Sequence, residues 1–287
     1  MSHSSTVPKG HHYFVPAASH YSTTLSIGIF LMALGLILKV NGVPAGAWGM
    51  PLGALLIIYV LFGWFGEIIS ENVGGKYTGW EDRSYRTGMV WFIFSEVMFF
   101  ACFFGVLYYT RRIALPELAS YEEALTPYKG FTAAWPSSGP MGDPFTPMGA
   151  WGIPAINTLL LLTSGVTLTI AHFGLLQNNR SKLNLWLGLT ILLGIVFLGF
   201  QAYEYGHAYS DLNLKLTSGI YGTTFYMLTG FHGFHVTIGT IMLIVVWFRC
   251  LKGHFRPDHH FAFEGVAWYW HFVDVVWLFL FIFVYWF

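Results

Sequence analysis

Apolar stretches alternate with short polar segments along the whole 287-residue chain. A membrane-crossing helix needs about 20 mostly apolar residues. The pattern predicts seven crossings, at residues 22–38, 51–66, 89–109, 154–176, 185–203, 220–248 and 266–287. The sequence therefore predicts an all-α, polytopic membrane protein with seven transmembrane helices.

The lengths of the connections divide these crossings into two groups. The first two are short and are joined by a Gly- and Pro-containing turn at residues 41–50, and a polar link at 70–88 separates them from the rest. We expect a single membrane domain over 1–287, in which a two-helix hairpin (20–70) is followed by a five-helix bundle (86–287). The one long connection, 110–153, is expected to be an extramembrane loop.

Composition agrees with this class and excludes several others. The chain is 55% hydrophobic and 10% charged, whereas soluble domains average about 25% charged residues. Its formal net charge of zero gives no reason to expect a nucleic-acid partner. Cys102 and Cys250 form no thiolate cluster, so we expect packed thiols and no metal site in this chain. The N-terminus lacks a signal-peptide pattern.

Lysine and arginine counts predict the orientation. With a cytoplasmic N-terminus, nine of these residues fall on the inner side and five on the outer side. Because cytoplasmic loops carry the excess of positive charge, we expect the N-terminus to be cytoplasmic and the C-terminus periplasmic. Glu96, Asp274, His172 and His271 then gather in the cytoplasmic leaflet, and His235 lies deeper.

Ionisable residues inside the predicted helices are the candidate functional groups, because they are costly in lipid. Glu96 lies among aromatic residues, and is either a hydrogen-bonded carboxyl of the bundle or a group on a proton path or in a lipid pocket. His271 and Asp274 are three residues apart on one helical face. They form either a structural pair or a contact with a partner subunit or a proton-conducting water chain.

Three further sets of polar residues have two interpretations each. His232 and His235 lie beside glycines, which favours close helix packing over haem ligation. His259 and His260 are interpreted as interfacial residues rather than ligands. Arg249 follows the sixth crossing, where it either reflects the positive-inside pattern or binds anionic lipid headgroups.

Four motifs resemble one known family. The segments FIFSEVMFF, TSGVTLTIAH, GIYGTTFYMLTGFHGFHVTIGT and HHFAFEGVAWYWHFVDVVWLFLFIFVYW follow one another in the order found in subunit III of the haem–copper cytochrome c oxidases. The match runs from about the second helix to the C-terminus. The family's seven helices are arranged as a hairpin and a five-helix bundle, with a phospholipid-containing cleft between them.

The resemblance implies a redox-silent subunit of a proton-pumping, bacterial aa3-type oxidase of the inner membrane, which reduces O2 with electrons from cytochrome c. Haem a, haem a3, CuA and CuB are then expected in partner subunits, and no cofactor in this chain. Subunit I is the expected main contact, with subunit II a further partner. The chain would stabilise subunit I, bind structural phospholipids and support proton uptake from the cytoplasm.

The resemblance also implies roles for individual residues. Glu96 matches the family's intramembrane glutamate, and Arg249, in WFRCLKGHF, matches a basic residue that meets lipid phosphate. Glu71, in IISEN, matches an acidic residue beside the lipid site. Glu71, Glu96 and Arg249 are therefore the lipid-binding candidates, and Glu96, His271 and Asp274 the proton-related ones; no catalytic residue is expected.

Three alternatives remain open at the level of sequence. The chain could be a quinol-oxidase subunit III, although that version generally lacks the first two helices. It could be a stand-alone proton or ion transporter that uses Glu96 and Asp274, or a membrane cytochrome that binds haem through His172, His232, His235 or His271. The absence of an internal repeat weakens the transporter interpretation.

Overall fold

A computed structural model describes residues 14–120, 131–140 and 142–286, and within these ranges the chain is helical with no β-strand. An isolated bridge joins Arg256 and His259. The predicted all-α class is confirmed. Two parts of the sequence analysis fall outside the described residues. One is the N-terminal segment, for which no signal peptide was predicted; the other is Lys9 and Lys129, which were counted in predicting the orientation.

Seven helices of the described chain are long and apolar enough to cross a membrane, as predicted. Their bounds are α1 Tyr21–Val40, α2 Gly46–Val73, α3 Gly79–Tyr109, α5 Ile153–Leu176, α6 Arg180–Ser210, α7 Gly219–Leu251 and α8 Phe261–Leu280. Two of them continue as π-helical turns: α3 through η1 (Thr110–Ala114) into α4 (Leu115–Ser120), and α8 through η2 (Phe281–Trp286).

The helices are longer than their apolar windows, so several predicted boundaries are wrong. The polar link expected at 70–88 is mostly helix, because α2 runs to Val73 and α3 begins at Gly79. Likewise, the loop expected at 110–153 begins as helix and stays helical to Ser120. The helical hydrogen-bond ladder does not depend on apolar side chains, so it continues into polar residues that a hydropathy pattern assigns to loops.

Residues 1–85 form the first of two compact units, and its helices α1 and α2 pack closely against each other. Glycines make this approach possible: a Cβ built on Gly49 would lie 2.8 Å from Cα of Gly35, and one on Gly28 3.1 Å from the Ile57 side chain. Small residues at such a crossing let two backbones approach within the membrane. The close packing of α1 and α2 is compatible with a helical hairpin.

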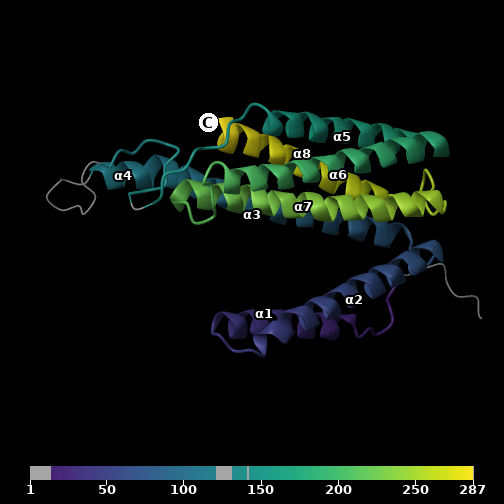
Figure 1. The fold of residues 1–287 in the computed structure, drawn as a ribbon. Coiled ribbons are helices and arrows are strands. Elements are labelled where there is room, and N and C mark those ends of the chain that lie inside the picture. Colours follow the sequence, from purple (N-terminus) through teal and green to yellow (C-terminus); the bar gives the residue numbers. More distant parts are fainter. Residues whose placement is uncertain (1–13, 121–130, 141, 287) are drawn as a thin grey trace, which may run out of the picture. The chain divides into compact units, whose positions relative to one another are not determined.

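Residues 86–287 form the second unit, in which α5, α6, α7 and α8 pack around one core and α3 lies along α7 (Figure 1). Helix α8 supplies the two largest fully buried side chains, Trp270 and Trp277. Their indole nitrogens donate hydrogen bonds to the hydroxyls of Ser164 and Thr158 on α5, each at 2.9 Å. The division into a hairpin and a five-helix bundle, with a lipid cleft between them, remains a prediction.

Candidate functional site

Glu96 and His235 form a contact between α3 and α7. Oε2 of Glu96 lies 2.9 Å from Nε2 of His235, and the two side chains are 21% and 10% exposed. Phe99 and Phe100 pack against the imidazole ring. The sequence placed His235 deeper than Glu96. The structure corrects this, because the two residues meet at the same level of the bundle.

The partners of His235 determine how many protons this pair holds. Its Nδ1 lies 2.6 Å from the carbonyl oxygen of Phe231. A carbonyl can only accept, so Nδ1 carries a proton and donates it. The contact between Nε2 and Glu96 then needs one more proton, either on the carboxyl or on the imidazole. In both arrangements the pair shares this proton and is electrically neutral.

The predicted pair His271 and Asp274 is present on α8. Nδ1 of His271 lies 3.7 Å from Oδ2 of Asp274, and Nε2 of His271 lies 3.5 Å from the Thr169 hydroxyl of α5. Asp274 is almost fully buried against Gly165, where an added Cβ would collide with Oδ2. Its Oδ1 has no hydrogen-bond partner among the described residues. The pair links α8 to α5, as the structural interpretation requires.

His232 is fully buried on α7, and its environment favours the packing interpretation over haem ligation. Nε2 lies 3.2 Å from the carbonyl oxygen of Val273. A carbonyl oxygen can only accept, so Nε2 donates this hydrogen bond. The ring packs against Trp277 at 5.1 Å and Phe197 at 5.9 Å between centroids. One ring nitrogen is thus used in a hydrogen bond that joins α7 to α8.

Arg249 is 8% exposed at the end of α7, and its guanidinium lies over the Phe255 ring at 4.5 Å. Its Nε has no hydrogen-bond partner within the described part of the chain. His254 follows in the next loop, and burial, reinforced by the charges of Arg249 and Lys252, lowers the pKa of its imidazole. Positive charge therefore gathers at this end of the bundle.

Glu71 belongs to the other compact unit, so it is described separately from Glu96 and Arg249. It is buried near the end of α2, where the Tyr77 hydroxyl donates to Oε2 at 2.8 Å and Lys76 lies 3.7 Å from Oε1. Burial, together with hydrogen bonds to Tyr85 and Glu71, raises the pKa of Tyr77 well above its usual range. Glu71 is thus held by its neighbours in sequence.

Glu204 is a buried carboxyl that the sequence reasoning did not single out. It is fully buried on α6, and the Tyr285 hydroxyl of η2 donates to its Oε1 at 2.6 Å. Nearby on α6, both amide atoms of Gln201 lack hydrogen-bond partners among the described residues. The predicted crossing ended at residue 203. Extending it by one helical turn would have placed Glu204 inside the membrane and marked it as a candidate.

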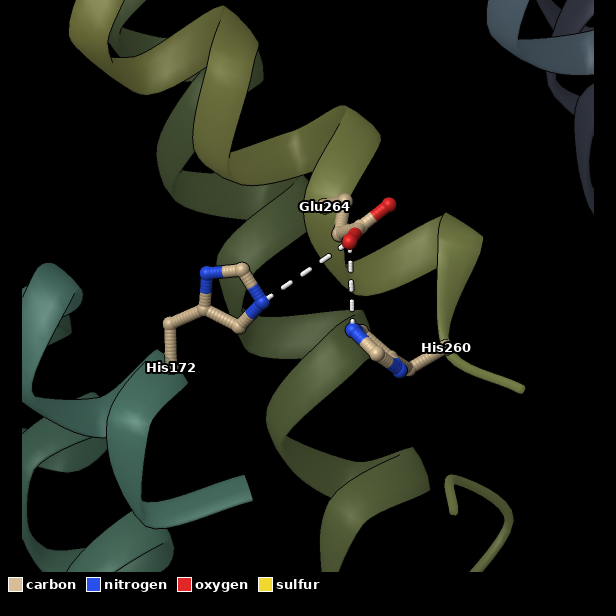
Figure 2. Close-up of side chains that lie close together, drawn as sticks. All are labelled: His172, His260 and Glu264. Atoms are coloured by element: carbon tan, nitrogen blue, oxygen red, sulfur yellow. Dashed lines mark ion pairs between the residues drawn. The ribbon is translucent and has the colours of Figure 1, made fainter. Parts of the chain in front are cut away.

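A second cluster lies where α5 ends and α8 begins (Figure 2). His260 and His172 direct their Nε2 atoms at Oε1 of Glu264, at distances of 3.2 and 4.0 Å. Arg86 of α3 forms an ion pair with the other oxygen, Oε2. Together, the two histidines and Glu264 offer three metal-ligand atoms within 4.8 Å of one another.

An apolar groove of about 700 Å³ runs along α3 and the last helix of the bundle. Its walls are mainly apolar, with five phenylalanines among the lining side chains, and two arginines, Arg111 and Arg112, lie at one end. Val97 and Phe100, which follow Glu96 within about one helical turn, also line it. An apolar channel that ends at guanidinium groups matches the chemistry of an acyl chain attached to a phosphate headgroup.

Comparison with known proteins identifies the family. Residues 11–287 match the family model described as cytochrome c oxidase subunit III. The chain is 39% identical to cytochrome c oxidase subunit 3 of Chondrus crispus, over 96% of this chain and 94% of that one. It is 40% identical to that of Rattus norvegicus (96% and 97%) and 37% identical to that of Arabidopsis thaliana (96% and 96%).

These matches cover nearly the whole chain, including most of the first compact unit and all of the second. The seven membrane-spanning helices agree with a membrane-bound respiratory oxidase, whose subunit III works in a complex with other oxidase subunits. The order of the four sequence motifs, which lie on α3, α5, α7 and α8, had already indicated the same assignment. The chain belongs to the cytochrome c oxidase subunit III family.

Proposed function

We propose that this chain is a redox-silent subunit that stabilises subunit I of a proton-pumping cytochrome c oxidase, seats structural phospholipids and supports proton uptake. Haem a, haem a3, CuA and CuB belong to the partner subunits, with subunit I the main contact and subunit II a further one. The complex lies in a bacterial inner membrane and takes electrons from cytochrome c, with the N-terminus of this chain cytoplasmic and its C-terminus periplasmic.

The observation that carries the lipid role is the apolar groove that ends at Arg111 and Arg112. An acyl chain in the groove would cover the apolar side chains of its walls, and the guanidinium groups would pair with the lipid phosphate. Arg249, whose buried Nε has no hydrogen-bond partner among the described residues, supports a second phosphate contact at the opposite end of the bundle. Glu71, next to Lys76, is the corresponding candidate in the first unit.

The proton role is supported by Glu96 and His235, which share one proton inside the bundle. Asp274 lies beside His271, and its Oδ1 has no hydrogen-bond partner in the described part of the chain, so it is a second group able to hold a proton. Such groups buffer protons close to a membrane surface without any redox chemistry. This chain would therefore assist proton delivery to subunit I rather than carry out the oxidation itself.

The test uses Glu96→Gln and Arg249→Ala in the purified complex. We expect both to reduce tightly bound phospholipid, and to make the oxidase lose activity several-fold faster during turnover, while the initial rate stays close to that of the unmodified complex. Arg256→Ala is the matched control, because this arginine is exposed in the same loop region. Unchanged lipid content and an unchanged inactivation rate in both variants would refute the proposal.

A further inference from the structure

The cluster of His172, His260 and Glu264 contains an arrangement that hydrogen bonds alone do not explain. Nδ1 of His260 lies 3.1 Å from the carbonyl oxygen of Arg256, which can only accept. Nδ1 is therefore the protonated nitrogen, and Nε2 presents its lone pair. This lone pair lies 3.2 Å from Oε1 of Glu264, which is also an acceptor. Two acceptors at this distance require a positive charge between them.

The imidazole of His172 points at the same place, and with its proton on Nδ1 it presents a third lone pair there. Nε2 of His172 lies 4.0 Å from the same carboxylate oxygen. The Nε2 atoms of His172 and His260 are buried and have no hydrogen-bond partner among the described residues. A single proton satisfies one pair of acceptors, whereas a metal ion at the centre satisfies all three.

The spacing also suits a metal. In a tetrahedral zinc site with bonds of about 2.0–2.1 Å, neighbouring ligand atoms lie roughly 3.3 Å apart. The distance from His260 to Glu264 already matches this value, and the contact from His172 to Glu264 needs to close by less than an ångström. The Nε2 atoms of the two histidines lie within 4.8 Å of each other and would have to draw closer on binding. Two imidazoles and one carboxylate are a known zinc donor set, which leaves a fourth position for water.

The surroundings hold the ligand atoms in this orientation. The carbonyl of Arg256 fixes the tautomer and the ring angle of His260, and Arg86 holds the outer oxygen of Glu264. Partners of this kind are typical of metal ligands, because they orient the atoms that bind. The His172 ring is packed against Phe263, so it is restrained from the side.

We propose that His172, His260 and Glu264 bind a divalent transition-metal ion, with Zn²⁺ the best fit. The ion would tie the end of α5 to the start of α8. From the sequence we expected no metal site in this chain and only an interfacial role for His260. The proposal differs from both expectations. It rests on the geometry of this cluster alone, and is independent of the proposed lipid and proton roles.

The first test measures zinc bound to the intact complex after removal of loosely held metal. We expect one more saturable zinc per complex in the unmodified protein than in His172→Gln or His260→Gln, and at least a tenfold weaker affinity in Glu264→Gln. Excess Mg²⁺ should not compete, because imidazole donors favour zinc over magnesium. His259→Gln is the matched control: it is the neighbouring histidine, exposed and outside the cluster, and it should bind zinc normally.

A second measurement does not depend on whether the variants assemble. A crystal or frozen sample of the unmodified complex with zinc should show metal density, or an anomalous signal at the zinc edge, between these three side chains. Zinc that stays bound equally in the ligand variants and in the control would overturn the proposal. So would the absence of metal from this position at saturating zinc, since a protonated histidine would then account for the contact.

Discussion

A carboxyl group inside an apolar bundle needs a partner, and the choice of partner decides what the carboxyl can do. Glu96 meets His235, whereas Glu264 meets two histidines and an arginine. Glu96 and His235 share one proton, whereas Glu264 and its two histidines direct lone pairs at one point, where a metal ion could bind. Neighbouring helices thus give the same residue type two different chemistries.

The contact between Glu96 and His235 can be tested through its effect on stability. We expect His235→Gln to destabilise the helix bundle, because it removes an interhelical contact. The coupling in a double-mutant cycle with Glu96→Gln should lie between about 0.6 kcal/mol, the average measured for such bonds in membranes, and about 1.7 kcal/mol, the largest value. The measurement is the midpoint of SDS-induced unfolding of the complex.

Thr237→Val is the control for this cycle. Thr237 lies on the same helix, is exposed, and donates its hydroxyl only to Gly233 of its own backbone. Its effect should stay within about 0.5 kcal/mol. A coupling energy near zero between positions 96 and 235 would show that the two side chains do not depend on each other.

The sequence identified Glu96, His271 and Asp274 as polar residues in apolar surroundings, but it could not supply their partners. Partners such as His235 for Glu96, or Gly165 against Asp274, come from other helices. Which faces of two helices meet depends on their rotation and crossing angle, which hydropathy does not contain. The three-residue spacing of His271 and Asp274 was predictable because both lie on one helix.

At the scale of elements, the apolar windows gave the number and order of the crossings but not their ends. Helix α6 extends to Ser210, seven residues beyond the predicted end at 203, and so includes Glu204. Helix α8 begins at Phe261 rather than 266, and so includes Glu264. Both missed carboxyls lie in these polar extensions, where the hydropathy signal ends before the helix does.

The close crossing of α1 and α2 gives a prediction at this scale. We expect Gly49→Ala to weaken the hairpin by about 1–3 kcal/mol, the usual cost of overpacking, because the new methyl group would meet the backbone of Gly35. Faster protease cleavage of α1 and α2 in the assembled complex would report the loosening.

Gly66→Ala is the matched control on the same helix, because a Cβ at Gly66 meets nothing within 4 Å. Alanine has the higher helix propensity, so this variant should be as stable as the unmodified chain or slightly more stable. Equal behaviour of the two variants would show that the two helices tolerate a wider separation than their glycines indicate.

At the scale of the whole molecule, the described residues place their buried polar groups between helices. Under the proposed function this chain is an assembly subunit, which needs internal rigidity and well-defined outer surfaces. The buried tryptophans of α8 and their hydrogen bonds to α5 supply that rigidity. The outer faces of the helices are apolar and suit contact with lipid or with other subunits.

The proposal that the haem groups belong to partner subunits can be tested by purifying the complex by means of this chain. We expect haem a absorption in larger copurifying subunits, none retained on this chain after separation, and oxidation of cytochrome c by the assembled complex. Oxidation of quinol instead would assign the chain to the quinol-oxidase branch. A haem that stays with this chain, or transport by the chain alone in liposomes, would refute the redox-silent role.

The dependence of the bundle on α8 has a consequence for biogenesis. A ribosome makes α8 after the six other membrane-spanning helices of the described chain, yet α8 supplies partners for Ser164, Thr158, His172 and Arg86. Until this helix is inserted, the earlier helices lack these contacts. The bundle is therefore completed only once α8 has been made, and a nascent chain that stops before residue 261 offers the insertion machinery an unfinished surface.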